Sequence, residues 1–191
     1  RSLGGWLPDD YIGGRKGRPD LLIRAGEGYV PGDVKKHSTV GARKATTALV
    51  SPLGNPVDLT EVAQLSSANS HRADDGMQLA HYTRMLQACG HHAGEDWLLG
   101  AIIGTSLIDT AHTGEALALV WHRLNEPMID TFSRSRGKKK RSLLDRYDHE
   151  HTFRMKVAER AALITGQQGD PEPLVIPIGQ DECDTCPYND P

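Results

Sequence analysis

The alternation of apolar and polar residues predicts two short strands near the start of the chain, joined by a tight turn. Residues 20–24 are apolar with a charge at each end, and residues 29–35 form a second extended run. The four residues between them, 25–28, include two glycines, which is typical of the turn of a β-hairpin. With the turn centred between Gly26 and Glu27, the residue numbers of every cross-strand pair add up to 53, as those of the central pair do.

Four longer elements follow from apolar spacing and from the residues at their ends. A stretch with helical spacing follows the acidic pair Asp74 and Asp75, and Gly90 marks its end. Two apolar runs are predicted to be strands, and a second stretch of helical spacing ends before Gly166. These elements cover residues 74–89, 97–106, 115–124 and 143–164.

The segment between the hairpin and the first helix, residues 36–73, is long and polar. Pro52, Gly54 and Pro56 would interrupt any regular element in it. We predict at most one short helix there, at residues 57–65. A loop of this length is either a flap that contacts a substrate or a disordered connection, and both interpretations remain open.

Together these elements predict a single α/β domain over residues 1–191, with a mixed sheet of four or more strands flanked by helices. A composition of 38% hydrophobic and 25% charged residues is ordinary for a globular protein of 191 residues. Nothing approaches the ~18 consecutive apolar residues of a membrane span, and the start does not resemble a signal peptide. Three cysteines argue against a disulfide framework and favour the reducing cytoplasm.

The net charge of −3 gives no overall preference for nucleic acids, but two local segments are strongly basic. Residues 134–141 contain six cations in eight positions. Residues 13–18, which lead directly into the hairpin, contain three cations and three glycines. Each segment is either a solvated, flexible loop or a contact for phosphates with salt-dependent affinity.

The predicted register brings three charged side chains to one face of the hairpin. Asp20 lies opposite Asp33, and the two-residue period of a strand places Lys35 on the same face. Directly opposed like charges destabilise a sheet, so a purely structural hairpin has no need of this pair. A divalent cation that prefers oxygen ligands, Mg²⁺ or Mn²⁺, would explain it. The alternatives are a hairpin with solvated charges and a register shifted by a bulge at residues 31–32.

This arrangement resembles the catalytic hairpin of the PD-(D/E)XK nuclease superfamily. Pro19 and Asp20 match its PD element, and Asp33, Val34 and Lys35 match its (D/E)-x-K element. The resemblance implies a restriction-endonuclease-like fold, a mixed β-sheet flanked by α-helices. It also implies a site for Mg²⁺ or Mn²⁺ made by Asp20, Asp33 and the Val34 carbonyl. Lys35 would position the attacking water or stabilise the transition state.

A second match points to the RecB-like branch of this superfamily. Gln78 and Tyr82 match its Q-x-x-x-Y helix, which follows the catalytic hairpin in the same order as here. In that branch the Gln and the Tyr face the active site and help to position the DNA strand. The resemblance thus implies a Mg²⁺-dependent deoxyribonuclease that hydrolyses phosphodiester bonds in DNA repair or recombination. Its expected partners are DNA, including single-stranded DNA, and a helicase or repair factor.

One metal ligand of the family stays unassigned in this chain. RecB-like nucleases supply an acidic or histidine ligand from a helix before the hairpin, and residues 1–18 predict no helix. Asp9 and Asp10 are substitutes within the chain, and a segment missing upstream is the other explanation. The gap favours an alternative function, a catalytically inactive nuclease-like scaffold that binds DNA or a protein partner.

The last residues carry a pair of cysteines. Residues 174–178 predict an edge strand, and Cys183 and Cys186 follow with the C-x-x-C spacing of zinc or iron–sulfur sites. Residues 183–191 would therefore begin a cysteine-containing tail. Some RecB-like nucleases carry a four-cysteine iron–sulfur staple at this end, but the third cysteine here, Cys89, lies on the predicted Gln–Tyr helix. We expect no iron–sulfur cluster within this chain, and a small zinc-stabilised interaction domain is the remaining alternative.

Overall fold

The computed structural model describes residues 2–3, 7–67, 71–110, 114–133 and 137–175. The chain divides into two compact units, residues 1–148 and residues 149–191, and each is described by itself. The assignment of all 191 residues to a single domain remains a prediction. Among the described residues, no helix combines the length and the apolar character needed to cross a membrane.

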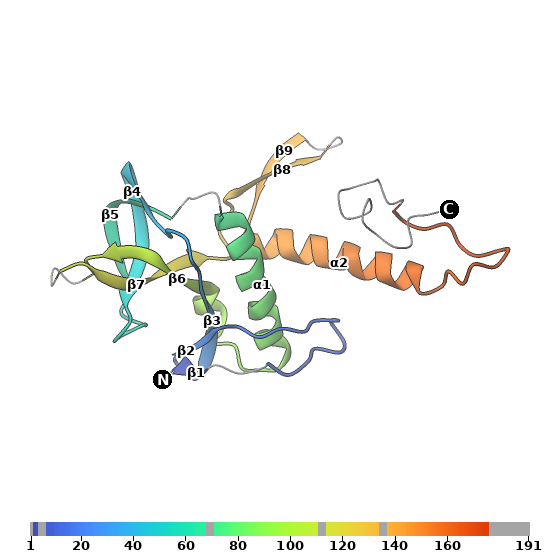
Figure 1. The fold of residues 1–191 in the computed structure, drawn as a ribbon, viewed down its shortest axis with the longest axis horizontal. Coiled ribbons are helices and arrows are strands. Elements are labelled where there is room, and N and C mark those ends of the chain that lie inside the picture. The colour runs from blue at the N-terminus through green and yellow to red at the C-terminus, as the bar shows by residue number, and fades with distance from the viewer. Residues whose placement is uncertain (1, 4–6, 68–70, 111–113, 134–136, 176–191) are drawn as a thin grey trace. The chain divides into compact units, whose positions relative to one another are not determined.

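The first unit is built on a seven-stranded mixed sheet. The strands are labelled in Figure 1. They are β1 (Ser2–Leu3), β2 (Leu21–Ala25), β3 (Gly28–Val34), β4 (Gly41–Pro52), β5 (Thr60–Ser66), β6 (Leu99–Ile108) and β7 (Ala116–Arg123). Their order across the sheet is β1-β2-β3-β6-β7-β4-β5. The β3–β6 pair is parallel, and the other neighbouring pairs are antiparallel. The predicted α/β class and mixed sheet are confirmed.

Strands β2 and β3 form the hairpin that the sequence predicts. Their pairs run from Leu21 opposite Gly32 to Ala25 opposite Gly28, so the residue numbers of each pair add up to 53. Gly26 opens the two-residue turn with a φ of 56°, a left-handed conformation that glycine adopts without steric cost. The pairing contains no shift, so the alternative register with a bulge is wrong.

The helix predicted after the hairpin is α1 (Arg72–Ala88), and the short 3₁₀ helix η1 (Glu95–Trp97) follows it. Helix α1 packs against β3 and β6. Its side chains Leu79 and Met85 are fully buried. Gly100 of β6 permits this close packing, because a Cβ atom there would lie 2.9 Å from Cβ of Leu79. The helix is therefore held at one distance from the strand next to the hairpin.

Different residues cover the two faces of the sheet. Ala101 of β6 belongs to a buried cluster with Val30, whereas the next residue, Ile102, belongs to a cluster with Leu79. Successive strand residues point to opposite faces, so these two clusters lie on opposite sides of β6. The cluster on the α1 side also contains the first residues of α2 (Leu143–Ala161). One face of the sheet is thus packed by α1 and by the start of α2.

Residues 36–73 do not form the loop that we predicted. Strands β4 and β5 occupy most of the segment and pair with each other at one edge of the sheet. Their pairing shifts between Ala42 and Thr47, where Ala45 has a positive φ of 58°. This irregularity hides the two-residue period from sequence reading, because the side chains change face within the strand. The short helix predicted at residues 57–65 is also wrong, since β5 lies there.

The basic run is partly a strand rather than a loop. Strand β9 (Gly137–Arg141) pairs antiparallel with β8 (Ile129–Ser133) in a second, two-stranded sheet. The loop interpretation is therefore wrong for residues 137–141, and residues 134–136 lie outside the described residues. Four consecutive cations gave no alternation to indicate a strand, so only the pairing with β8 reveals it.

The second unit contains the continuation of α2. The helix predicted at residues 143–164 is confirmed, although it ends at Ala161. After it, the carboxylate of Asp170 accepts hydrogen bonds of 2.6–3.1 Å from the backbone N–H groups of residues 165–167. These bonds hold the chain in a compact turn beyond the helix.

The predicted edge strand and the cysteine pair lie mostly beyond the described part of the chain. Leu174 and Val175 are described and are not in a strand. The remaining residues, 176–178, and the pair Cys183 and Cys186 lie outside the described residues.

Candidate active site

The hairpin brings the two predicted carboxylates together beside the backbone of Val34. Asp33 is the penultimate residue of β3 and is 3% exposed, and Asp20 directly precedes β2. The Val34 N–H donates a hydrogen bond of 2.9 Å to Oδ2 of Asp20. This bond continues the pairing beyond the last β2–β3 pair, Leu21 with Gly32. The register therefore delivers both carboxylates to one end of the hairpin.

The closeness of the two carboxylates changes their proton affinity. Burial raises the pKa of Asp33 to about 6, the Asp20 carboxyl adds to the rise, and Lys35 opposes it. The hydrogen bond with Asp33 lowers the pKa of Asp20, and the Val34 N–H lowers it further. The pair holds one proton at mildly acidic pH, and both groups are negative at neutral pH. A bound cation would relieve this concentration of negative charge.

Lys35 places an ammonium against this pair. Its Nζ lies 2.6 Å from Oδ2 of Asp33, and its backbone N–H donates to the carbonyl of Ile103 on β6. Burial by itself lowers the pKa of Lys35, but the hydrogen bond and charge of Asp33 outweigh it, and the net pKa is raised. The side chain is therefore charged at neutral pH. It can stabilise negative charge but is poorly suited to accept a proton.

Helix α1 adds Gln78 and Tyr82 to the same network. Nζ of Lys35 donates a 2.6 Å hydrogen bond to Oε1 of Gln78. Nε2 of Gln78 donates in turn to the hydroxyl of Tyr82, at 3.0 Å. The two residues are four apart and so share one face of the helix. The structure thus connects the carboxylate pair to the Gln–Tyr face through Lys35.

Asp75 and His37 extend this network, and the sequence analysis assigned neither of them to it. Asp75 is 6% exposed, and its Oδ2 lies 2.8 Å from Nε2 of His37. Its other oxygen lies 3.9 Å from Nζ of Lys35. The His37 ring stacks on the ring of His71, with a centroid distance of 4.2 Å. The spacing along the helix could have identified Asp75, because it precedes Gln78 by three residues and therefore shares its helix face.

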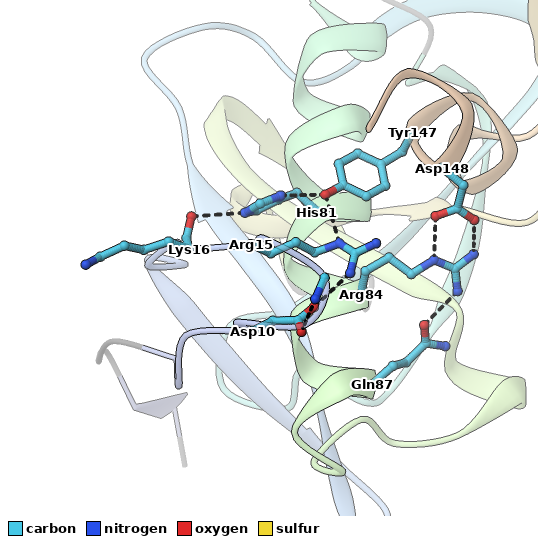
Figure 2. Close-up of polar contacts among 9 residues, drawn as sticks. Asp10, Arg15, Lys16, His81, Arg84, Gln87, Tyr147 and Asp148 are labelled. Atoms are coloured by element: carbon cyan, nitrogen blue, oxygen red, sulfur yellow. Dashed lines mark hydrogen bonds and ion pairs between the residues drawn. The ribbon is translucent and has the colours of Figure 1, made fainter. Parts of the chain in front are cut away.

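Figure 2 shows how the segment before the hairpin is fastened to α1 and to the first turns of α2. Asp10 and Arg15 close a tight turn through two backbone hydrogen bonds and an ion pair of 2.7 Å. Nε of Arg15 donates to the hydroxyl of Tyr147 at 3.2 Å. The His81 ring joins both sides, with Nδ1 2.7 Å from that hydroxyl and Nε2 3.1 Å from the carbonyl of Lys16.

A second ion pair in Figure 2 strengthens the same junction. Nε and Nη2 of Arg84 donate to the two carboxylate oxygens of Asp148, at 2.9 Å and 2.5 Å. Arg84 also donates to Oε1 of Gln87 on its own helix, at 2.6 Å. Such bidentate pairing fixes the orientation of both side chains. It holds the start of α2 against α1.

The basic segment before the hairpin, residues 13–18, passes directly over Tyr82. A Cβ atom at Gly17 would lie 2.8 Å from Cε1 of that ring, so only glycine permits this approach. Lys16 and Arg18, on either side of it, are exposed. The charge of Arg18 contributes to the lowered pKa of Asp20. Two cations are therefore displayed where the chain enters the hairpin.

The donors present fit a small divalent cation that keeps ligands from water and substrate. Mg²⁺ in such sites typically takes one or two carboxylates, and Asp20 and Asp33 supply two. Within the described ranges, no three His, Cys, Asp or Glu side chains gather as a complete metal site made by protein would require. Asp9 and Asp10, the predicted substitutes for the upstream ligand, form ion pairs with cations of their own segment. The donor set does not fit a closed structural metal site.

Among the cysteines, Cys89 is half-buried at the C-cap of α1, and its thiol donates to the carbonyl of Leu86. Cys183 and Cys186 lie outside the described residues, so the zinc and iron–sulfur interpretations stay predictions.

Comparison of the chain with protein-family models, with curated proteins and with solved structures found no match. The resemblance to RecB-like nucleases therefore rests on the residues of the hairpin and of α1.

Proposed function

We propose that this chain is a metal-dependent nuclease of the PD-(D/E)XK superfamily, RecB-like branch, which hydrolyses phosphodiester bonds in DNA. The continuous contact from Asp33 through Lys35 and Gln78 to Tyr82 supports this proposal most. A helix that only filled the core would place apolar residues toward the hairpin at these positions. Here a buried carboxylate, an ammonium and an amide meet instead, which costs solvation and suggests a chemical role.

The finer fold assignment belongs to the same proposal. The β2–β3 hairpin, the helix α1 and the parallel partner β6 follow one another in the chain and pack together. We infer that this is a restriction-endonuclease-like core. The pair β4 and β5 would then be an addition at one edge of the sheet, between the hairpin and α1.

Each residue of the network has a distinct expected role. Asp20, Asp33 and the Val34 carbonyl would hold Mg²⁺ or Mn²⁺, an ion that lowers the pKa of bound water and neutralises phosphate charge. Lys35 is charged and would stabilise the negative charge that develops on the phosphate as water attacks. Gln78 orients Lys35, and Tyr82 borders the site on the side of the helix. In hydrolysis, the water oxygen bonds to phosphorus as the bond to the leaving sugar oxygen breaks.

The test is cleavage of end-labelled single- and double-stranded DNA in Mg²⁺, Mn²⁺ or EDTA. We expect cutting that depends on the metal ion and is lost in Asp33→Ala and Lys35→Ala. Asp58→Ala and Lys36→Ala are matched controls, because both residues are exposed and are of the same types. The controls should cut like the parent chain. Full activity in Asp33→Ala would rule out the proposed site.

One observation favours a second candidate, an inactive scaffold that binds DNA or a protein partner. Among the described residues, the acidic pair lacks a third grouped ligand. A scaffold would bind DNA in EDTA but would not cut it with any metal ion. A nuclease would bind DNA in EDTA and cut it when Mg²⁺ or Mn²⁺ is added. A role in DNA repair or recombination and a helicase or repair-factor partner follow from the resemblance alone. A cytoplasmic location follows from the three cysteines, and all of these belong to the same proposal.

A further inference from the structure

The two-stranded sheet of β8 and β9, here called the basic hairpin, is separate from the seven-stranded sheet (Figure 1). Its base is attached to the first unit, because Met128 and Ile129 pack against a buried cluster that includes Leu143. The Met128 N–H also donates to the carbonyl of Arg141, at 3.0 Å. Beyond this base the strands continue in pairs as far as Ser133 opposite Gly137. The basic hairpin is thus attached to the first unit at its base.

The register sorts the side chains of the basic hairpin onto two faces. Ile129 packs on the core and lies opposite Arg141, so its face is turned toward the protein at the base. The other face, here called the outer face, carries two cross-strand pairs. These pairs are Phe132 with Lys138 and Asp130 with Lys140. All four residues of the outer face are exposed.

Phe132 lies on β8 opposite Lys138 and is 73% exposed. A structural hairpin gains little from a phenyl ring this exposed, because the ring buries little apolar area. Four consecutive cations on one strand, Lys138 to Arg141, also repel one another. An unstacked base would cover the ring, and phosphates would neutralise the cations. Single-stranded nucleic acid supplies both groups at once, whereas a duplex keeps its bases stacked.

We propose that the outer face of the basic hairpin binds single-stranded DNA. Phe132 stacks on one base, and Lys138 and Lys140 contact phosphates of the same strand. These two lysines alternate along β9 and are therefore about 6.5 Å apart, on the same side. That the strand is DNA rests on the proposed nuclease function. The inference adds a substrate-binding surface outside the network of Asp33, Lys35 and Gln78.

The test measures fluorescence anisotropy of a labelled oligothymidylate with the full chain in EDTA, where cleavage cannot occur. Phe132→Ala should weaken binding about tenfold, which corresponds to the loss of one stacked base. Lys140→Ala should weaken it as well and reduce the slope of log affinity against log salt by about 0.7. Lys139→Ala is the matched control, because it removes the same charge from the opposite face of the same strand. It should leave the slope unchanged.

The contrary results are equally definite. Equal binding by Phe132→Ala and the parent would overturn the inference, and so would an equal loss in Lys139→Ala and Lys140→Ala. Duplex DNA bound as tightly as the single strand would remove the role of stacking. All three side chains are exposed, so thermal melting should be unchanged and a folding defect would be visible. If the variants lose binding but the parent cuts no DNA in any metal ion, the binding surface stands and the nuclease proposal fails.

Discussion

Nζ of Lys35 lies 2.6 Å from Oε1 of Gln78, a residue 43 positions further along the chain. The contact joins the end of the hairpin to the second turn of α1. An amide oxygen accepts from the ammonium without adding charge, so Lys35 stays paired with Asp33 at 2.6 Å on its other side. The ammonium is therefore held between two elements rather than left to move in solvent.

We expect Gln78→Met to reduce cleavage about tenfold while leaving the overall fold intact. Methionine fills a similar volume but cannot accept the hydrogen bond, so the ammonium would no longer be oriented toward the carboxylates. Single-turnover cleavage measures this effect, and the loss should appear in the rate of chemistry rather than in DNA affinity. Gln87→Met is the control, because Gln87 lies on the same helix and accepts from Arg84 instead. Equal rates for the parent and Gln78→Met would show that this contact has no role in orientation.

Metal-free Asp33→Asn should be more stable than the parent at pH 7, and the difference should vanish near pH 4. The pKa of Asp33 is raised from 3.8 to about 6, so the native state binds this proton more tightly than the unfolded chain. That contribution to stability is complete below about pH 4 and is lost as pH rises through 6. The full shift corresponds to about 3 kcal/mol, and solvent screening reduces the expected gain to about 1–2 kcal/mol. Urea unfolding in EDTA at several pH values measures it.

The exposed Asp58→Asn is the control for this series, because it removes a carboxylate that the fold does not bury. The same titration affects the metal ion, because a carboxylate must lose its proton to become a ligand. Mg²⁺ affinity, followed by calorimetry, should therefore fall about tenfold per pH unit below pH 6. An affinity that is constant from pH 5 to pH 7 would mean that Asp33 is not a ligand.

We expect Gly100→Ala to destabilise the protein by about 1–3 kcal/mol through overpacking. A Cβ atom at Gly100 would lie 2.9 Å from Cβ of Leu79, so α1 would have to move away from β6. This movement would also separate Gln78 from Lys35 and slow cleavage. Gly41→Ala is the control, since a Cβ atom there meets nothing within 4 Å. Unchanged melting of Gly100→Ala would show that the helix has more freedom than the packing indicates.

The hairpin and α1 could be predicted because their signals are local. Two glycines around Glu27 define the turn, and the two-residue period then decides which side chains share a face. Asp20 and Asp33 follow from that register without knowledge of the rest of the fold. The spacing of Gln78 and Tyr82 along one helix face is local in the same sense, as is the match of these residues to a family motif.

The remaining elements and contacts could not be predicted, because the interactions that form them involve residues far away in the sequence. Strand β4 contains a register shift near Ala45 that breaks its alternation, and its pairing with β7 depends on residues about seventy positions away. The strand β9 is recognisable only from its partner β8. The pair of Asp75 and His37 exists because the parallel strands β3 and β6 bring the end of the hairpin beside α1.

The sequence by itself determined the elements whose formation depends on neighbouring residues: the β2–β3 hairpin with its two carboxylates, the helix with its Gln–Tyr face, and the strands β6 and β7. Only the tertiary structure decided that Lys35 meets Gln78 and that Gly17 lies over Tyr82. It also decided that β8 places Phe132 opposite Lys138 of the basic run. The physical reason is distance along the chain. Turn geometry and side-chain period act over a few residues, whereas contacts between elements depend on packing that the whole sheet imposes.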